Sequence, residues 1–312
     1  MKNLSFRNIF KKTEGVVECM PLKKNPFVSN GKALVAIEKS SKDIEARVKA
    51  AVDAIGGFKK IISKGNSVLI KPNYVFPYPP PCITSLDFLL AVIKHCYKAG
   101  ASQVVVGESS AWWVDTEKTM RKFGIVEAVE KIGAKVAFFD QGKWITVKMN
   151  SDVIQDAAFP EEAFKHDKII FLPNMKTHRL ARFTLSLKLS YGFLSHRYRT
   201  AQLHFVNLEK KIADVNKAIH PDLVIMDGRK CFVTQGPDDG DVREPNVILA
   251  SGDRIAIDVE AIKILKSYNA KNHLIYDNPF QYEQIRRAVE LGLGVKSQEE
   301  ITVKVVEKQN KL

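Results

Sequence analysis

The stretch that decides the fold is residues 67–107, SVLIKPNYVFPYPPPCITSLDFLLAVIKHCYKAGASQVVVG. Its first six residues, SVLIKP, are a short apolar run closed by a proline, which is typical of a buried strand. Ser85 is placed to cap a helix over 86–98, and Gly100 ends that helix. The last six residues, SQVVVG, form a second apolar run. A strand, a helix and a strand in this order predict a crossover unit with parallel strands.

The same alternation continues outward on both sides of this unit. Further strands are predicted at 33–37, 135–140, 168–173, 222–227, 246–251 and 301–306, and further helices at 42–54, 117–132, 206–219, 251–268 and 281–291. Ser251 is expected to cap its helix, with Asp253 in the first turn. The predicted fold class is therefore α/β, a largely parallel, doubly wound sheet flanked by helices, with a cleft between two lobes if the chain has two.

The chain is expected to have three parts along its length. Residues 1–30 form an N-terminal extension, residues 31–300 form the α/β domain, and residues 301–312 form a C-terminal strand and tail. If there are two lobes, their boundary is placed near residue 150. The insert 174–205 has no clean period, and we expect it to be a functional or mobile loop.

The composition is that of an ordinary globular chain with a strong positive charge. Of its 312 residues, 45% are hydrophobic and 27% are charged, and the formal net charge is +13. This excess predicts attraction to anions, whether nucleic acid, phosphate or carboxylate. The four cysteines form no CxxC pair, so no iron–sulfur cluster or disulfide framework is expected. The sequence offers no apolar run long enough for a signal peptide or a membrane span, which predicts a cytoplasmic chain without a membrane partner.

About half of the net charge lies in one stretch, Lys165–Arg199. Eight of its residues are basic and one, Asp167, is acidic. The basic residues are Lys165, Lys168, Lys176, Arg179, Arg182, Lys188, Arg197 and Arg199. Because this stretch directly follows an apolar run, it predicts a site for an anionic ligand just past a buried strand. The four arginines are expected to attract an anion or to coat a mobile flap.

Polar side chains follow several predicted strands at the point where each strand ends. In open α/β sheets, ligands bind outside the carboxyl ends of the strands. The residues at these exits are Lys71 and Asn73, Glu108 and Ser109, Asn174 with Lys176 and His178, and Asp227. Lys71 is the sharpest of these, since a lysine that ends an apolar strand is costly to bury without a partner. The proline-rich tract 74–81 and the pair Trp112–Trp113 receive no role.

Lys176 and His178 stand two residues apart, so in an extended backbone both project to one side. A histidine gives or takes a proton near neutral pH, and a neighbouring lysine favours its neutral form. This pair therefore suits acid–base chemistry on a carboxylate or phosphate. No metal is expected, and the alternative metal set is His178, His196 and His204, whose spacing matches no standard motif.

A set of ordered motifs resembles one known family. The motifs are VLIKPN (68–73), VVVGES (104–109), PNMKTH (173–178), LSLKLSYG (185–192), LVIMDG (223–228), QGP (235–237) and ASGDRIAID (250–258). Together they resemble the domain-of-unknown-function 362 family over about residues 31–300. Some members carry a ferredoxin-like module, whose cysteines this chain lacks, and the asparagine usual after the Lys188 position is Leu189 here. The resemblance implies that one cleft contains Lys71, Asn73, Lys176, His178, Lys188, Asp227 and Asp258, and it implies no reaction.

Three function classes follow from these observations. The first is an enzyme acting on a small anionic substrate, carboxylate or phosphate, by acid–base chemistry of an isomerase, racemase or transferase type. Its expected catalytic residues are His178, Lys176, Lys188 and Asp227, and its expected substrate-binding residues are Lys71, Asn73, Glu108, Ser109, Asn174 and Asp258. The second is a nucleic-acid-binding or RNA-modifying protein, suggested by basic residues interleaved with Phe183, Tyr191, Phe193 and Tyr198. The third is a non-catalytic module that binds a cofactor or serves a redox partner. The sequence leaves the cofactor and the oligomeric state open.

Overall fold

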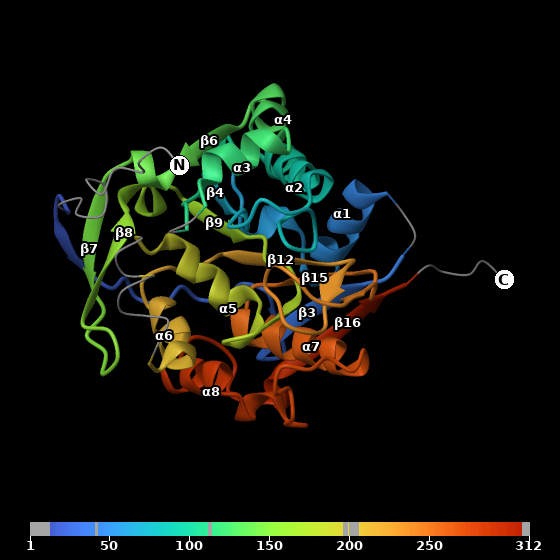
Figure 1. Ribbon diagram of the computed structural model, residues 1–312. Coiled ribbons are helices and arrows are strands. Elements are labelled where there is room, and N and C mark those ends of the chain that lie inside the picture. Colours follow the sequence, from blue (N-terminus) through green and yellow to red (C-terminus); the bar gives the residue numbers. More distant parts are fainter. Residues whose placement is uncertain (1–12, 41–42, 112–113, 196–198, 200–205, 308–312) are drawn as a thin grey trace.

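The computed structural model describes residues 13–40, 43–111, 114–195, 199 and 206–307. Its centre is a nine-stranded sheet (Figure 1). Eight strands follow one another across it as β16 (Ile301–Val306), β3 (Lys32–Glu38), β15 (Val247–Ser251), β12 (Leu223–Gly228), β9 (Lys168–Phe171), β4 (Ser67–Lys71), β5 (Gln103–Glu108) and β6 (Lys135–Phe138), and β2 (Val28–Ser29) pairs with β3. The run from β12 to β6 is parallel throughout, and β15 lies antiparallel to both of its neighbours. The predicted α/β class with a largely parallel sheet is confirmed.

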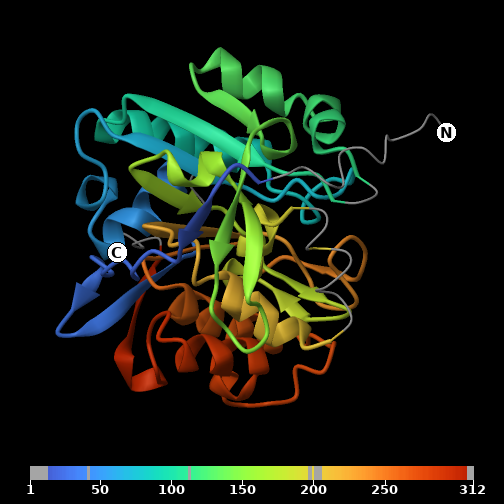
Figure 2. The same ribbon diagram turned by 90° about the vertical axis from the view of Figure 1, so that its left-hand side faces the viewer.

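Helices cover both faces of this sheet (Figures 1 and 2). The alternation along β4 decides which face each side chain joins, because Val68 and Ile70 belong to one buried cluster and Leu69 to the other. One cluster includes residues of α1 (Ile44–Ile55), α2 (Leu86–Ala99), α3 (Thr116–Lys122) and α4 (Ile125–Lys131). The other includes residues of α5 (Ser186–Leu189), α6 (Leu208–Val215), α7 (Arg254–Ser267) and α8 (Glu283–Glu290). The sheet is therefore doubly wound.

Smaller elements complete the described chain. A separate three-stranded sheet is formed by β1 (Val16–Glu18), β7 (Trp144–Lys148) and β8 (Asp156–Pro160), and two short hairpins pair β10 (Lys176–His178) with β11 (Arg182–Thr184) and β13 (Cys231–Phe232) with β14 (Val242–Arg243). Short 3-10 turns are η2 (Phe58–Lys60), η3 (Phe139–Gln141), η4 (Glu161–Phe164), η5 (Ser190–Phe193), η7 (Pro279–Gln281) and η8 (Gln298–Glu300). Within the described residues, no helix is both long and apolar enough to cross a membrane.

The structure corrects two local expectations from the sequence. The helix predicted over 117–132 is two helices, because Gly124 takes a positive φ between α3 and α4. Asp253, rather than Ser251, is the N-cap of α7, and its carboxylate accepts from the backbone N–H of Ile255 at 2.9 Å. Ser251 instead donates its hydroxyl to the carbonyl oxygen of Leu34. A two-residue shift of the helix start therefore exchanges the roles of the two side chains.

The insert 174–205 differs from the expected loop as far as residue 195. It contains the β10–β11 hairpin, α5 and η5, and most of its residues there are buried. Its short elements lie against the sheet, with Leu187 and Phe193 in the same buried cluster as α7. Long-range packing, rather than a local hydrophobic period, gives this segment its structure, so the sequence pattern alone missed it.

Between the adjacent strands β4 and β9, the helices that follow the strands change from one face of the sheet to the other. The chain leaves β4 through α2, on one face of the sheet, and leaves β9 through α5 and α6, on the other face. In doubly wound sheets, such a reversal opens the carboxyl ends of the two adjacent strands to ligands. The segments that follow Lys71 and Phe171 therefore lie at the topological switch point.

Candidate functional site

The sheet brings the strand-exit residues to one edge. β12, β9, β4 and β5 are adjacent and parallel, with Lys71 paired to Phe171 and Val224 paired to the same residue from the other side. Lys71 and Glu108 are the last residues of their strands, and Asn174 forms an isolated bridge with Asp227. Residues from four separate stretches of the chain thus lie at the carboxyl edge of the sheet.

Lys71 and Glu108 form a buried ion pair at this edge. Lys71 Nζ donates to Glu108 Oε1 at 2.6 Å and to the Pro72 carbonyl oxygen at 2.8 Å, and it lies 5.7 Å from the ring centroid of Phe193. Both side chains are almost completely inaccessible. Burial lowers the pKa of Lys71 to about 8, although Glu108 acts in the opposite direction. Lys71 is therefore already engaged by protein groups.

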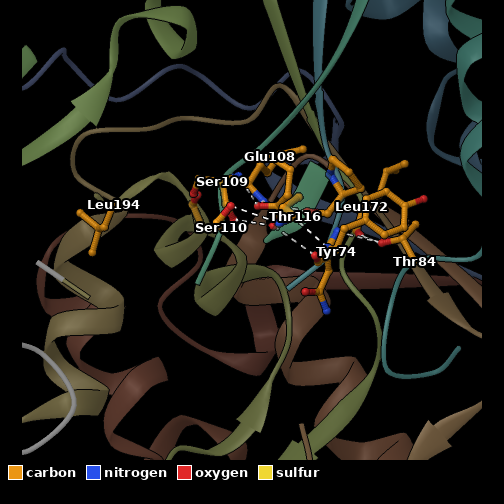
Figure 3. Close-up of polar contacts among 12 residues, drawn as sticks. Tyr74, Thr84, Glu108, Ser109, Ser110, Thr116, Leu172 and Leu194 are labelled. Carbon is orange, nitrogen blue, oxygen red and sulfur yellow. Dashed lines mark hydrogen bonds and ion pairs between the residues drawn. The ribbon is translucent and has the colours of Figure 1, made fainter. Parts of the chain in front are cut away.

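Hydrogen bonds from neighbouring loops fix the Glu108 carboxylate. Its Oε2 accepts from the backbone N–H of Tyr74 at 3.1 Å, and its Oε1 accepts from the backbone N–H of Ser109 at 3.0 Å. Thr116 donates its hydroxyl to the Ser109 carbonyl oxygen at 3.2 Å (Figure 3). Thr84 ties the β4 loop to β9 by donating to the Leu172 carbonyl oxygen at 3.2 Å. These bonds hold the loops after β4, β5 and β9 together.

Arg199 adds a second buried cation to this group. Its guanidinium donates to the carbonyl oxygens of Leu194 at 2.8 Å and Gly192 at 2.7 Å, and to the hydroxyl of Ser109. Ser109 in turn donates to the Gly192 carbonyl oxygen at 2.7 Å. Burial lowers the pKa of Arg199, and the Glu108 carboxylate opposes this shift. From the sequence, Arg199 was expected to attract an anion or to coat a mobile flap, and in the structure it is buried next to Ser109.

Asn73 and Asn174 meet across the switch point. Asn73 Nδ2 donates to Asn174 Oδ1 at 3.3 Å, and Asn174 Nδ2 donates to the Ile83 carbonyl oxygen at 3.1 Å. Asn73 remains partly exposed, whereas Asn174 is buried. The contact links the loop after β4 directly to the loop after β9, so both side chains line the switch point.

Asp227 is held at the edge by groups from two elements. Its Oδ2 accepts from the hydroxyl of Ser85 at 3.1 Å and from Arg229 at 2.8 Å, while Arg229 also binds Asp87. Ser85 occupies the N-cap position of α2, as the sequence predicts, but its hydroxyl bonds Asp227 and not the helix backbone. The charge of Asp227 is thus matched by Arg229, which suits a fixed acceptor.

Lys176 is the buried lysine of the β10 strand. Its Nζ donates to the Cys82 carbonyl oxygen at 2.6 Å, which joins the β10–β11 hairpin to the loop after β4. Burial lowers the pKa of Lys176 to about 8, with the thiol of Cys82 and the carboxylate of Asp238 acting in the opposite direction. Asp238 is itself paired with Arg179 at 2.9 Å. Lys176 therefore has a backbone partner, and the Asp238 carboxylate that acts on it is paired with Arg179.

His178 is buried, and its ring is oriented by the hairpin turn. Its Nδ1 accepts from the backbone N–H groups of Leu180 at 3.1 Å and Ala181 at 3.2 Å. Because Nδ1 is an acceptor for both amides, the neutral ring carries its proton on Nε2. A proton could be added to Nδ1 only if both amide bonds broke. This geometry makes His178 a hydrogen-bond donor through Nε2.

Lys188 differs from the other lysines of the site. Among the described residues, its Nζ has no hydrogen-bond or ion-pair partner, and it lies 5.7 Å from the ring centroid of Tyr191. Loss of hydration and then the positive charges of Lys176 and Arg199 lower the pKa of Lys188 to about 7. The residue nevertheless keeps part of its surface exposed. Both protonation states of this amine are populated near neutral pH.

Asp258 does not reach the strand exits. Its two carboxylate oxygens accept from the backbone N–H groups of Ser186 at 2.8 Å and Leu187 at 3.0 Å, at the start of α5. Burial raises the pKa of Asp258 to about 7, although these hydrogen bonds and Arg254 act in the opposite direction. The residue expected to bind substrate therefore holds the short helix that carries Lys188.

The remaining candidates from the sequence either form ion pairs away from the strand exits or lie outside the described residues. Arg179 pairs with Asp238, and Arg182 lies 3.4 Å from Glu209 in a partly buried pair, so acidic side chains engage both arginines. Arg197, His196, His204 and the pair Trp112–Trp113 lie outside the described residues. Within the described part of the chain, no group of three or more His, Cys, Asp or Glu residues is arranged to hold a metal ion. A surface hollow of about 480 Å³ lies elsewhere, near Lys263 and Phe280.

Sequence reasoning missed two features of the site. Arg199 gave no local signal, since its partners are the backbone of η5 and a serine ninety residues away. Gly192 was quoted in the LSLKLSYG motif without a role, and a Cβ there would lie 2.6 Å from Lys71 Nζ. The LSLKLSYG motif was therefore the sequence signal that could have pointed to Gly192.

Comparisons with known proteins identify relatives of this chain. A sequence model of the family described as "Domain of unknown function (DUF362)" matches residues 68–263. The thylakoid-associated protein sll1697 of Synechocystis sp. strain PCC 6803 is 26% identical over 228 residues, which covers 71% of this chain and 70% of that protein. The lactate racemase apoprotein from Thermoanaerobacterium thermosaccharolyticum superposes with a TM-score of 0.45 and 16% identity, over 76% of this chain and 59% of that one. This chain thus spans about three fifths of the racemase chain.

Proposed function

The chain belongs to the domain-of-unknown-function 362 family, whose description names no activity, and from its site we propose an enzyme that acts on a small anionic substrate. The substrate carries a carboxylate or a phosphate. It binds at the switch point between β4 and β9, and a lysine exchanges a proton with it. The residue proposed to transfer the proton is Lys188, whereas the sequence had favoured His178 as the acid or base.

The observation that carries this proposal is the imbalance of charge at the switch point. The positive charge of Arg199 acts on Lys71 and on Lys188, and that of Lys176 acts on Lys188. Against these four cations stand the carboxylate of Glu108, which pairs with Lys71, and those of Asp140 and Asp238, which act on Arg199 and Lys176. Burying unbalanced charge is costly, and a bound anion reduces that cost. Lys188 is the member of the group whose ammonium has no partner among the described residues. An anion bound beside Lys188 would balance the excess positive charge of this group of buried cations.

The proton-transfer role falls to Lys188 rather than to His178. A general base works best when its pKa lies near the working pH, and burial brings the pKa of Lys188 to about 7. His178 accepts two backbone hydrogen bonds at Nδ1, which occupy the nitrogen that would otherwise take up a proton. Lys176 contributes positive charge to the site. The hydrogen bonds of Asp227, Asn73 and Asn174 fix the loops at the carboxyl edge of the sheet.

The proposal is tested by proton exchange in D₂O. Small 2-hydroxy acids, 2-oxo acids and phosphorylated sugars are incubated with the purified full chain, and loss of carbon-bound hydrogen is followed by NMR. Lys188→Arg keeps the charge but not a neutral amine at pH 7, so exchange should fall at least about 100-fold. Lys304→Met, at an exposed lysine of β16, is the matched control and should keep full activity.

Binding is measured separately from chemistry. Phosphate and the same acids should raise the thermal midpoint of the wild type, and Lys188→Met should reduce that rise. Unchanged exchange in Lys188→Arg would remove Lys188 from proton transfer. If no tested carboxylate or phosphate shifts the midpoint, the anion site itself is refuted.

The nucleic-acid hypothesis loses the pattern that motivated it. Phe183, Tyr191 and Phe193 are buried, so they offer no stacking face for bases, and Tyr198 lies outside the described residues. Arg179 and Arg182 are engaged with acidic side chains. The described surface therefore gives this alternative no specific support.

A further inference from the structure

We propose that Lys188 is a nucleophilic amine that forms an imine with the carbonyl carbon of a 2-oxo acid or of a carboxylate-bearing aldehyde. This inference rests on the proposed anion site and names the substrate class that the site would take. For a carbonyl substrate, the covalent step takes the place of direct proton transfer by the free amine of Lys188.

The first support is the difference among the three lysines at the switch point. Lys71 donates to Glu108 and to the Pro72 carbonyl oxygen, and Lys176 donates to the Cys82 carbonyl oxygen. Lys188 Nζ, by contrast, has no hydrogen-bond or ion-pair partner among the described residues. The acceptors of Lys71 and Lys176 stabilise the protonated form, which cannot attack a carbonyl, whereas no acceptor among the described residues stabilises the Lys188 ammonium.

The second support is the surroundings of the amine. The charges that bear on Lys188 come from Lys176 on β10 and from Arg199, while the ring of Tyr191 on η5 lies beside it. Asp258 and Arg254, on α7, are engaged instead with the α5 backbone and with carbonyl oxygens near residue 216. A lysine next to other cations and away from water is held partly neutral, which is how lysine nucleophiles are activated.

The third support is that the backbone that carries Lys188 is held in place by hydrogen bonds from other elements. Asp258 fixes the first two amides of α5, and Asn216 donates to the Leu187 carbonyl oxygen at 2.9 Å while accepting from Ser190 at 2.7 Å. Lys188 itself is partly exposed. A fixed backbone favours reaction at one position.

The neighbouring cations select the carbonyl compound. A carboxylate adjacent to the carbonyl would lie close to the Lys176 ammonium while Lys188 reaches the carbonyl carbon.

The neutral Lys188 nitrogen forms the C–N bond, and the carbonyl π electrons move to oxygen, which takes a proton. Loss of water then breaks the C–O bond and leaves the imine. The step consumes one carbonyl compound, releases one water and needs no oxidant or reductant.

The test is reductive trapping with glyoxylate as the probe. The purified full chain is treated with glyoxylate and sodium cyanoborohydride at pH 7, which converts an imine into a stable carboxymethyl-lysine. Peptide mapping by mass spectrometry then gives the rate at every lysine. We expect modification at Lys188 to be at least about tenfold faster than at exposed Lys304, because far more of its amine is neutral at this pH.

Two comparisons identify the cause of a fast reaction. Acetaldehyde, which lacks the carboxylate, should react more slowly than glyoxylate at Lys188, and Lys176→Met should narrow that difference. The rate at Lys188 should level off above about pH 7, while the rate at Lys304 keeps rising to pH 9. Lys188→Arg should abolish the adduct in that peptide and leave the Lys304 rate unchanged.

The outcomes separate this inference from the proposed function. Modification confined to exposed lysines overturns the imine. If glyoxylate still raises the thermal midpoint in that case, the anion site stands without the covalent step. If glyoxylate and phosphate both fail to shift the midpoint and Lys188 stays unmodified, the inference and the proposed function fail together.

Discussion

Gly192 shows how tightly the cations of the site are packed at the scale of single residues. A Cβ at this position would lie 2.6 Å from Lys71 Nζ and 2.7 Å from Lys71 Cε. Lys71 cannot easily move aside, because Glu108 and the Pro72 carbonyl oxygen both bind its ammonium. Glycine is therefore required here because a larger side chain would collide with the ion pair, and not because the backbone adopts a special conformation.

Gly192→Ala should consequently destabilise the protein. We expect the free energy of unfolding to fall by about 1–3 kcal/mol, since the added methyl group forces the buried pair apart. Urea denaturation of the wild type and the variant measures this. Gly15→Ala is the control, because a Cβ at Gly15 meets nothing within 4 Å. Equal stability of Gly192→Ala and Gly15→Ala would contradict the packing described.

At the scale of elements, α5 is a four-residue helix that the rest of the protein holds in place. A helix this short is not stable by itself, since nucleation is costly and few internal hydrogen bonds form. Asp258 on α7 accepts from its first two amides, and Asn216 binds the carbonyl oxygen of Leu187. The position of Lys188 therefore depends on residues well outside its own segment.

Asp258→Ala should loosen α5. It leaves the buried N–H groups of Ser186 and Leu187 without acceptors, so we expect a loss of about 2–5 kcal/mol in unfolding free energy and slower trapping of glyoxylate at Lys188. Asp258→Asn keeps one acceptor and should lose less of both. Urea denaturation and peptide mapping measure the two effects. If Asp258→Ala weakens stability but leaves the Lys188 rate intact, Asp258 does not position Lys188.

At the scale of the whole molecule, the site is a cost to folding that depends on pH. Lys188 has a pKa of about 7 in the folded protein against an ordinary value of 10.5. Between these values the unfolded chain binds more protons, so wild-type stability rises with pH across this window. The penalty is fully present below pH 7 and disappears above about pH 10.5. Its slope is at most about 1.4 kcal/mol per pH unit.

Lys188→Met removes this penalty. The variant should be more stable than the wild type at pH 6, and its advantage should shrink by pH 9, as urea midpoints at both values will show. Lys304→Met, at an exposed position, should show no pH-dependent difference from the wild type. An advantage of Lys188→Met that is the same at both pH values would mean that Lys188 is not held partly neutral.

The main architecture could be predicted because local patterns encode it. The eight longer strands of the central sheet follow short apolar runs, and α2 lies between a serine and a glycine that mark its ends. Two errors arose where two local signals competed, at the α3–α4 break and at the start of α7. In both places the sequence indicated a helix, and its boundary depended on a single backbone conformation or hydrogen bond.

The sequence by itself determined the α/β class, the strand exits and the excess of positive charge. Tertiary structure alone decided that Arg199 lies beside Ser109, that Asp258 holds α5 and that Lys188 has no partner among the described residues. The physical reason is distance along the chain. A strand or helix is encoded in the period of a few neighbouring residues, whereas the pairing and hydration of a charge depend on groups brought together from as far as 142 positions away.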